Sequence, residues 1–305
     1  TARAVCLRDY AQGSDVFPMA LDQPFRFIHR ADLIEVLRQA ATAAGVRLRL
    51  NTRVERVSTE GGGAMLGIAD ADTEGHGITI AADGVSSAAR AFLNPNNKAV
   101  FTGQVAWRAT VAGIDTAPEA LVFMGPGRHL VWYPLRGGAL ANIVAVEERA
   151  AWAQEGWNHP DDPVHLRDAF QRFCPEVRQL LDCVEVAHLW GLHRHPVAAV
   201  WHRGPVALLG DAAHPTLPFL AQGANMALED AYTLARCLAE DADLGGAFAR
   251  YQALRRDRTQ RIVDAANGNA KNYHLRPGPV RFAAHTALRL AAQVAPRAVT
   301  GRYLG

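Results

Sequence analysis

The stretch "GDAAHPTLPFLAQGANMALEDA", residues 210–231, places a Gly-Asp pair between a predicted strand and a predicted helix. The preceding run "PVALLG" (205–210) is nearly all apolar, as in a parallel strand buried on both faces. Asp211 then stands at the carboxyl end of a sheet strand, where α/β folds bind ligands, and Gly210 lets the backbone approach a ligand closely. A lone Gly-Asp pair would indicate only an Asp that caps a helix after a tight turn, but the whole string favours a ligand site.

The helix that follows opens with "LAQGAN" (220–225) and strengthens the prediction of a ligand site. The first N–H groups of a helix have no acceptors inside the helix, and the positive end of the helix dipole lies there. This end favours an anion or the electron-rich edge of a ring. His214, close to the Gly-Asp pair, is expected to pack or bond locally rather than to take part in chemistry.

The rest of the chain predicts an α/β part that an antiparallel sheet interrupts. The periodicity of residues 29–46 predicts a helix, whereas residues 1–17 show no recognisable element. Alternating or apolar runs predict a strand pair in 46–57 and further strands in 64–70, 77–84, 101–111, 121–135, 139–148 and 185–201. Residues 163–184 predict a helical region broken by a proline, and the α/β part resumes near residue 204.

Composition places the chain among ordinary soluble enzymes. Of its 305 residues 49% are hydrophobic and 20% charged, and the net charge of +2 is too small to predict binding of nucleic acid. The four cysteines lack CxxC spacing, which predicts reduced thiols in a cytoplasmic protein, and no metal site is predicted. No apolar run predicts a membrane span, and the amphipathic segment 280–295 is expected to pack on its own domain.

Three segments carry a resemblance to a known family. Residues 210–231 resemble the second FAD-binding motif of the class A flavoprotein monooxygenases, in particular of aromatic hydroxylases similar to salicylate hydroxylase and 3-hydroxybenzoate 6-hydroxylase. "AADGVSSAAR" (81–90) is similar to the family's DG motif, and "HRADLIEVL" (29–37) to the segment in which an Arg reaches the flavin. Alone, the first of these two would indicate an ordinary Asp-Gly turn and the second a surface Arg. Beside the longer motif, both favour a flavoprotein.

The resemblance implies a set of residues that bind FAD. The family's motif Asp, which bonds a hydroxyl of the ribityl chain, corresponds to Asp211. Arg30 corresponds to the Arg that reaches the flavin, and Asp83 and Gly84 correspond to the DG pair. The remaining residues lie at the strand end or in the loop and helix start that cover the flavin ring: Gly210, Pro218, Gln222, Gly223, Ala224 and Asn225.

The antiparallel segment is expected to hold the substrate. In "GPGRHLVWYPL" (125–135), His129 and Tyr133 are four residues apart, so on a strand their side chains point to the same face. The resemblance implies a substrate-facing His and Tyr at this spacing, which makes His129 the candidate base and makes Tyr133 and Gln222 substrate-orienting residues. Alternatively, His129 lies in a turn and Tyr133 packs before the next proline. Arg108 is a further candidate, for a substrate carboxylate, although an Arg on an exposed strand is commoner.

The resemblance also implies the reaction. In this family NADH or NADPH reduces FAD, O2 adds to the reduced flavin at C4a, and the resulting hydroperoxyflavin transfers a hydroxyl group to an activated aromatic ring. A phenol has a pKa of about 10 and a histidine one of about 6.5, so His129 suits the role of proton acceptor. The predicted function is therefore an FAD- and NAD(P)H-dependent monooxygenase of a small phenolic or aromatic-acid substrate, with O2 as co-substrate and a homodimer as the expected assembly.

One departure from the family concerns the adenosine end of the cofactor. Family members begin with a βαβ unit that carries G-x-G-x-x-G, and this sequence contains no such motif. The chain is therefore expected to be a fragment, to have its first segment disordered or omitted, or to come from a truncated gene. The expected fold is α/β: an incomplete Rossmann-like FAD-binding domain, interleaved with an antiparallel-sheet substrate domain and closed by C-terminal helices.

The expected domains are an FAD-binding domain in 1–98 and 204–245, a substrate domain in 99–203 and closing helices in 246–305. Two other functions stay open. A truncated, non-catalytic relative would bind a small aromatic ligand or a partner subunit, without flavin. An FAD-dependent oxidase or halogenase would keep the fold and change the reaction, although the lysine-bearing motif of halogenases is absent from the sequence.

Overall fold

The computed structural model describes residues 1–114, 117–151 and 159–294. These residues form two compact units. The eight-strand unit comprises the described residues of 1–47, 101–192 and 270–305, and the two-sheet unit comprises residues 48–100 and 193–269. No helix in the described part of the chain is long and apolar enough to cross a membrane.

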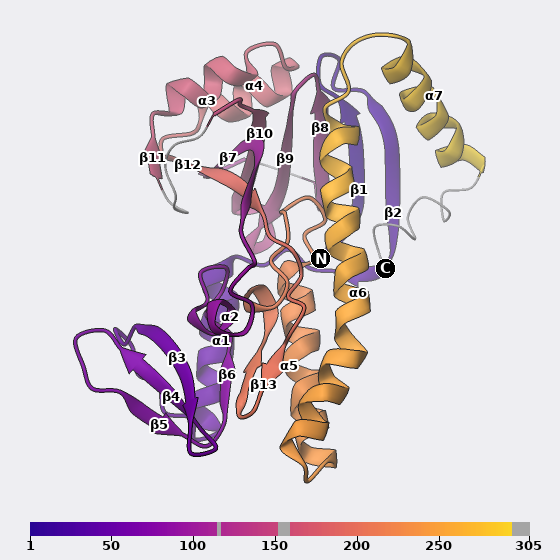
Figure 1. Cartoon of the computed structure of the whole chain (residues 1–305). Helices are drawn as coiled ribbons and strands as arrows, with labels where there is room; N and C mark the ends of the chain where they lie inside the picture. The colour runs from indigo at the N-terminus through magenta and orange to yellow at the C-terminus, as the bar shows by residue number, and fades with distance from the viewer. Residues whose placement is uncertain (115–116, 152–158, 295–305) are drawn as a thin grey trace. The chain divides into compact units, whose positions relative to one another are not determined.

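The eight-strand unit is built on a mixed sheet whose strands lie in the order β11-β12-β7-β10-β9-β8-β1-β2 (Figure 1). β1 pairs in parallel with β8 and antiparallel with β2, whereas β10 pairs antiparallel with both β7 and β9. The bounds are β1 Ala2–Asp9, β2 Asp15–Phe25, β7 Val100–Ala112, β8 Glu119–Gly125, β9 Arg128–Leu135, β10 Leu140–Glu148, β11 His159–Asp161 and β12 Ala187–Arg194.

Two helices cover one face of this sheet. α3 (Pro163–Phe170) and α4 (Pro175–Asp182) each begin with a proline, whose fixed φ suits the first helical position. Leu130 and Trp132 of β9 belong to the same buried cluster as side chains of both helices. This cluster is the main apolar core of the unit.

The opposite face carries the residues expected to meet the substrate. Val131 of β9 packs against a second cluster, which includes Tyr273 at the end of α6 (Leu244–Tyr273). His129 and Tyr133 lie two residues to either side of Val131 and therefore share its face. The spacing argument made from the sequence is confirmed to this extent.

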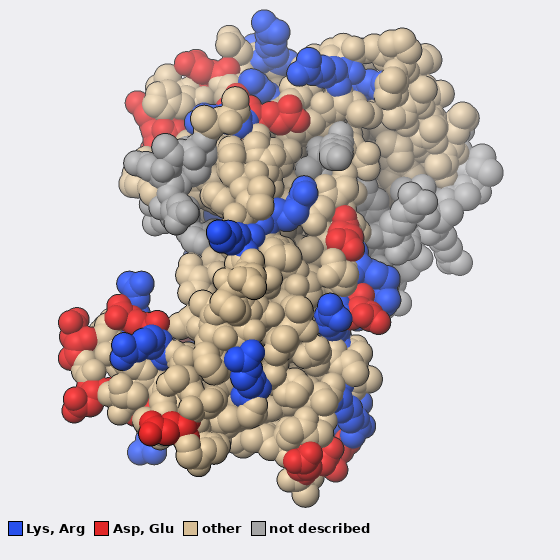
Figure 2. All heavy atoms as spheres, in the orientation of Figure 1, with Lys and Arg blue, Asp and Glu red and all other residues tan. Residues whose placement is uncertain are grey.

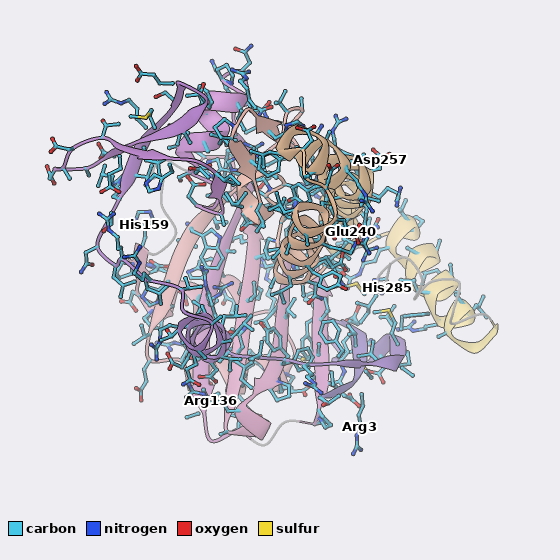
Figure 3. The ribbon with its side chains drawn as sticks, turned by 90° about the horizontal axis from the view of Figure 1, so that it is seen from below. Arg3, Arg136, His159, Glu240, Asp257 and His285 are labelled. Atoms are coloured by element: carbon cyan, nitrogen blue, oxygen red, sulfur yellow. The ribbon has the colours of Figure 1, made fainter. Side chains whose placement is uncertain are left out.

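α7 (Pro279–Val294) packs on β2, as expected for an amphipathic segment that contacts its own domain. Arg281 is buried on this helix, and its guanidinium donates to Asp9 Oδ2 at 2.7 Å and to the Met124 carbonyl at 3.1 Å. His285, labelled in Figure 3, is also buried. These contacts attach α7 to the eight-strand unit.

α1 (Arg30–Ala43) has no buried residue. The His29 side chain caps it by accepting a hydrogen bond from the N–H of Ala31 at 3.3 Å. Asp32 in its first turn lies 2.7 Å from the guanidinium of Arg136, labelled in Figure 3, in the short 3-10 turn η1 (Arg136–Gly138). This hydrogen-bonded contact with Arg136 lowers the pKa of Asp32.

The two-sheet unit holds two three-stranded sheets. In one, β14 (Val206–Leu208) pairs in parallel with β6 (Thr79–Ala81) and antiparallel with β13 (His202–Arg203). The other is an antiparallel sheet in the order β3-β4-β5. The remaining bounds are β3 Val54–Glu60, β4 Gly63–Ile68, β5 Glu74–His76, α2 Ala88–Leu93, the 3-10 turn η2 Gly210–Ala212 and α5 Gly223–Glu240.

The mixed α/β class predicted from the sequence is confirmed, as are the helix within 29–46, the proline-broken helices within 163–184 and the buried parallel strand before Gly210. The predicted strand pair in 46–57 is wrong, because the strand in this region is β3, which pairs with β4 instead. The sequence also does not predict β1 and β2. The functional division into four segments remains a prediction, because a division by contacts does not test which segment holds a ligand.

Charged side chains of both signs are interspersed on the face drawn in Figure 2. The same mixing occurs along α5 and α6, where Glu240 pairs with Arg236 and Arg250, and Glu229 with Arg258. The charges on this face therefore do not indicate a binding partner that is strongly positive or strongly negative.

Candidate functional site

The Gly-Asp pair lies at the carboxyl end of β14, as the sequence predicts. The backbone turns at once into η2, and Gly210 adopts a positive φ of 60°. A Cβ on Gly210 would lie 3.1 Å from the Cβ of Ala227 in α5, so both the turn and the close approach require glycine. Asp211 is exposed at this corner. The strand thus places the Asp211 carboxylate at an exposed corner that packs closely against α5.

Asp230, near the end of the same stretch, holds this corner from within α5. Its side chain is fully buried, and Oδ2 lies 2.5 Å from Nε2 of His214 and accepts the N–H of Gly210 at 3.2 Å. The other oxygen, Oδ1, accepts from Nε of Arg255 at 2.7 Å. His214 therefore forms a hydrogen bond inside this stretch, as expected. Through Asp230, the Glu-Asp pair at 229–230 holds the Gly-Asp pair at 210–211.

Arg90 connects the DG motif to the Gly-Asp corner. Gly84 has a φ of 78°, and Asp83 accepts the N–H of Ala88 at 3.0 Å where α2 begins. The buried guanidinium of Arg90 then donates to the carbonyls of Ala212 and Ala213, both at 2.9 Å. It also donates to the carbonyl of Pro196. Burial lowers the pKa of Arg90, but the three carbonyls satisfy its charge, and the two motifs are held as one piece.

The start of α5 offers backbone donors beside this corner. Gln222 is the N-cap residue and no side chain caps the helix, so the N–H groups of Gly223, Ala224 and Asn225 lie at an open helix end. No acidic residue lies in the first turn. The preceding loop turns at Ala221, which has a φ of 53°, and Pro218 in that loop is exposed.

These groups fit the ribityl and ring end of a flavin. An exposed carboxylate suits a ribityl hydroxyl, and the open end of a helix suits the electron-rich edge of the ring. Gly210 lets α5 pack closely against this corner, so that the carboxylate and the helix start lie near each other. The donor set in the two-sheet unit therefore matches the part of FAD that the sequence predicts, and the roles of individual residues remain predictions.

The candidate substrate residues lie in the eight-strand unit. Tyr133 of β9 stands opposite Asn142 of β10, and Asn142 stands opposite Thr110 of β7. The Tyr133 ring lies 4.7 Å from that of Phe27, and burial raises the pKa of its phenol. Asn142 is buried, and its Nδ2 has no hydrogen-bond partner in the described residues. Polar groups of three neighbouring strands thus gather on this face of the sheet.

His129 is buried on the same face and hydrogen-bonded through its ring. Its exposed fraction is 1%, and Nδ1 lies 2.7 Å from Nε2 of His274, the residue after α6. Nδ1 of His274 lies 2.9 Å from Oε1 of Glu148 at the end of β10. Burial, together with the neighbouring His274, holds the pKa of His129 well below its usual value. The sequence does not predict His274 as a partner of His129, or Glu148 as a partner of His274.

Arg30 and Arg108 are the other candidates in this unit. Arg30 is the first residue of α1 and is exposed. Arg108 is exposed on β7, and its guanidinium lies 5.2 Å from the centre of the Trp190 ring. Its charge also opposes the rise in the pKa of Tyr133. Arg108 and Tyr133 are therefore near enough to interact, as a joint role toward one substrate would need.

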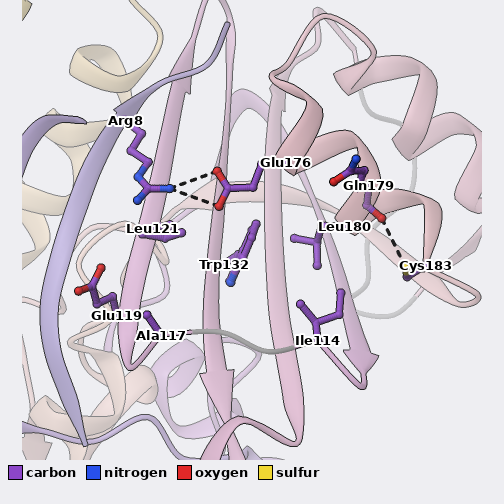
Figure 4. A pocket seen from close by; sticks show the side chains of 10 residues that line it. All are labelled: Arg8, Ile114, Ala117, Glu119, Leu121, Trp132, Glu176, Gln179, Leu180 and Cys183. Atoms are coloured by element: carbon purple, nitrogen blue, oxygen red, sulfur yellow. Dashed lines mark hydrogen bonds and ion pairs between the residues drawn. The ribbon is translucent and has the colours of Figure 1, made fainter. Parts of the chain in front are cut away.

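A cavity of about 430 Å³ opens on the other side of the sheet (Figure 4). Leu121, Trp132 and Leu180 form its apolar wall, and the ion-paired side chains of Arg8 and Glu176 also line it. Trp132 and His129 point to opposite faces of β9, so this cavity is separate from the candidate substrate residues. The predicted substrate residues thus lie on the face of the sheet away from this cavity, and the place of the substrate site remains a prediction.

The fold and the Gly-Asp corner define the class of α/β proteins that bind a dinucleotide cofactor at the carboxyl ends of parallel strands. The chain belongs to the FAD binding domain family, which matches residues 23–266. It is 34% identical to the 3-amino-4-hydroxybenzoate 2-monooxygenase PtmB3 of Streptomyces platensis, over 84% of this chain and 65% of that protein. It is 35% identical to the 3-hydroxybenzoate 6-hydroxylase of Polaromonas naphthalenivorans (strain CJ2), over 85% of this chain and 66% of that protein.

The structure is similar to that of a salicylate hydroxylase in complex with its substrate. The TM-score is 0.80 at 26% identity, over 95% of this chain and 77% of the other. The resemblance to aromatic hydroxylases is thereby confirmed. The chain spans 65% and 66% of the two enzymes from Streptomyces and Polaromonas, about two thirds of each, so their activities come to this chain only as a proposal.

Proposed function

We propose that this chain acts in an FAD-dependent monooxygenase that hydroxylates a hydroxybenzoate-like aromatic acid. The observation that carries the proposal is the Gly-Asp corner, which Asp230 and Arg90 hold beside the open start of α5. The names of the two relatives give 3-amino-4-hydroxybenzoate and 3-hydroxybenzoate as their substrates. Each of these compounds has a phenol and a carboxylate. NADH or NADPH is the proposed reductant and O2 the co-substrate.

In this proposal the two-sheet unit binds the flavin. Asp211 accepts a hydrogen bond from a ribityl hydroxyl, and the N–H groups at Gly223 and Ala224 bind the edge of the ring. The flavin supplies the oxygen activation, through the C4a-hydroperoxyflavin that the family resemblance implies. Gln222 remains a predicted substrate-orienting residue, and Arg30 a predicted flavin contact.

The eight-strand unit supplies the residues that act on the substrate. A phenol with a pKa of about 10 is less than about 1% ionised at neutral pH, and the phenolate is the form that activates the ring. His129 takes the phenolic proton, while Tyr133 orients the ring and Arg108 pairs with the carboxylate. The proposed partners are thus a small aromatic acid and O2, with a cytoplasmic homodimer as the expected setting.

A titration with FAD tests the proposal first. Saturable binding should shift the visible flavin bands, and hydroxybenzoates should then stimulate NADH oxidation and yield a dihydroxylated product. Asp211→Asn should weaken FAD binding by about tenfold, the effect of one charged hydrogen bond of about 1.4 kcal/mol. Asp257→Asn, at an exposed position of α6 labelled in Figure 3, is the matched control.

Two outcomes would contradict the proposal for this chain. A lack of saturable flavin binding would favour the non-catalytic alternative, in which an aromatic ligand binds without flavin. Flavin reduction and peroxide release without any hydroxylated product would favour an oxidase instead.

A further inference from the structure

A buried chain of hydrogen bonds runs from the candidate base to the protein surface. Nδ1 of His129 lies 2.7 Å from Nε2 of His274, and Nδ1 of His274 lies 2.9 Å from Oε1 of Glu148. The side chain of His274 is 2% exposed, whereas that of Glu148 is 48% exposed. All three residues belong to the eight-strand unit. Because His129 itself is buried, this series of hydrogen bonds is a route by which its proton can reach water.

Neighbouring groups hold the two rings in place. The N–H of Gly127, in the turn between β8 and β9, donates to the carbonyl of His274 at 3.3 Å. The Tyr273 ring lies 5.1 Å from the His129 ring, in an edge-on arrangement. The alignment of the rings is therefore fixed from the β8–β9 turn and from the end of α6.

The Glu148 carboxylate, at the end of this series of hydrogen bonds, determines which ring nitrogens carry protons. An ionised carboxylate only accepts hydrogen bonds, so Nδ1 of His274 donates to Glu148. A neutral His274 then has its lone pair on Nε2, which accepts from the Nδ1–H of His129. His129 is left with its lone pair on Nε2. That atom is the one that can take a proton from a substrate.

We infer that His274 and Glu148 form a relay that carries the substrate proton from His129 to solvent. The inference rests on the proposed function, in which His129 accepts the phenolic proton. As the substrate O–H bond breaks, Nε2 of His129 gains that proton. The Nδ1 proton of His129 passes to Nε2 of His274, the Nδ1 proton of His274 passes to Glu148, and Glu148 releases a proton to water. Transfer in the reverse direction, onto the phenolate oxygen of the product, restores the starting tautomers.

The charges around the relay favour transfer toward the surface. Burial disfavours a lasting imidazolium at His129 and lowers the pKa of His274, although Glu148 opposes the second effect. Arg128 adds to the lowering at His274, and its guanidinium pairs with Glu147 at 2.9 Å. Glu147 is thus engaged with Arg128, and Glu148 is the carboxylate in contact with the relay.

The first test reads the tautomers and needs neither flavin nor substrate. Long-range 15N–1H NMR of the 15N-labelled chain near neutral pH should show His129 and His274 as neutral rings protonated on Nδ1. The variants His129→Gln and His274→Gln assign the two signals. A proton on Nε2 of either ring in the wild-type chain overturns the relay, whether or not the chain hydroxylates an aromatic acid.

The second test uses Glu148→Gln, which keeps the shape of the side chain and removes the proton acceptor. Hydroxylation of 3-hydroxybenzoate by the FAD-loaded chain should slow about tenfold, a part of the roughly 10²–10⁴-fold that general acid–base catalysis contributes. The solvent deuterium isotope effect should rise, and Glu148→Asp should restore much of the rate.

Glu176→Gln is the matched control, because its side chain is 43% exposed and lies on α4, on the other face of the sheet. It should leave the rate and the isotope effect unchanged. An unchanged rate and isotope effect in Glu148→Gln would contradict the relay. A wild-type chain that binds FAD but hydroxylates none of the hydroxybenzoates would contradict the proposed function, and the NMR result would still decide the hydrogen-bond pattern.

Discussion

The carboxylate of Asp230 binds the ring of His214, with 2.5 Å between Oδ2 and Nε2, and so joins the two ends of the stretch 210–231. Both side chains are fully buried, and the second carboxylate oxygen is bound by Arg255. A buried carboxylate is stable only when its charge is paired and its oxygens accept hydrogen bonds. These contacts therefore make the candidate flavin-binding corner depend on one residue of α5.

Replacing Asp230 with Asn should destabilise the two-sheet unit strongly. The Arg255 guanidinium would lose one of its two charge partners inside the protein, and removal of one member of a buried pair costs about 3–5 kcal/mol. Since Glu229 also pairs with Arg255, at 2.7 Å, we expect the lower end of this range. Urea unfolding followed by tryptophan fluorescence measures the change, because the Trp201 ring lies 5.3 Å from that of His214.

Glu229→Gln is the control for this prediction. Glu229 is the adjacent residue and pairs with Arg258 at 2.9 Å and with Arg255 at 2.7 Å, but its side chain is 37% exposed, and Arg255 keeps its contact with Asp230 in this variant. An exposed ion pair contributes at most about 1 kcal/mol, so the free energy of unfolding should change little. Equal losses in the two variants would show that burial of Asp230 does not matter.

Replacing Arg90 with Met should both destabilise the two-sheet unit and weaken FAD binding. The substitution keeps apolar bulk but leaves three carbonyls without their donor, at a cost of about 1–3 kcal/mol for a buried group that loses its partner. Because two of these carbonyls belong to Ala212 and Ala213, the Gly-Asp corner should lose its alignment. We expect FAD affinity to fall about tenfold or more in a flavin titration.

Arg203→Met provides the comparison for Arg90. Arg203 is exposed in the same unit, and its guanidinium lies 5.3 Å from the centre of the Phe92 ring. A surface contact of this kind contributes about 0.5–1 kcal/mol and touches none of the flavin candidates. FAD affinity should stay within about twofold of the wild-type value. A similar loss of affinity in both variants would point to a general effect of removing positive charge.

The sequence predicts the Gly-Asp corner because the signals for it are local. The apolar run, the Gly-Asp pair and the helix start lie within the 21 consecutive residues 205–225. The roles of Arg90 and of the His129–His274 pair are not local, since their contacts join residues that are 122 and 145 positions apart. No periodicity or spacing rule connects such positions, so only the folded chain shows them.

β1 and β2 are missed for a related reason. β1 pairs with β8, which lies more than a hundred residues further along the chain, and β2 contains prolines at positions 18 and 24. Proline lacks the N–H that a sheet ladder needs, and it argues against a strand when only the sequence is considered. β2 tolerates both because it is the edge strand of the sheet. The strand pair predicted in 46–57 is wrong for the opposite reason. Leu48 and Leu50 alternate with polar residues as in a strand, but both side chains are exposed, so no core holds this segment as a strand.

A comparison of Gly210→Ala with Gly204→Ala separates the cost of backbone strain from the cost of crowding by a new Cβ. Both glycines have a positive φ, 60° at Gly210 and 53° at Gly204, so either alanine should cost about 1 kcal/mol. A Cβ at Gly204 meets nothing within 4 Å, whereas at Gly210 it meets the Cβ of Ala227 at 3.1 Å. Gly210→Ala should therefore cost roughly 1–3 kcal/mol more and also reduce FAD binding. Equal unfolding midpoints in urea would show that α5 moves freely away from the corner.

The four cysteines should differ sharply in their reaction with a disulfide reagent such as DTNB. Cys183 is exposed, whereas Cys6, Cys174 and Cys237 are buried. Burial, reinforced by the carboxylate of Glu119, raises the pKa of the Cys6 thiol to about 12, so almost no reactive thiolate forms near pH 8. The native chain should release one equivalent of the coloured thiol quickly, and Cys183→Ser should abolish this phase. All four should react quickly in denaturant.

The same pKa shift makes the folded state less stable at high pH. The Cys6 thiol ionises near pH 9 in the unfolded chain but only near 12 in the folded one. The unfolded state therefore loses its proton first, and the contribution of the buried thiol, complete below about pH 9, is lost as the pH rises toward 12. Cys6→Ala should flatten the fall in the urea midpoint between pH 8.5 and pH 10. An equally steep fall in this variant, or a fast thiol in the native chain that Cys6→Ala removes, would contradict the burial of Cys6 against Glu119.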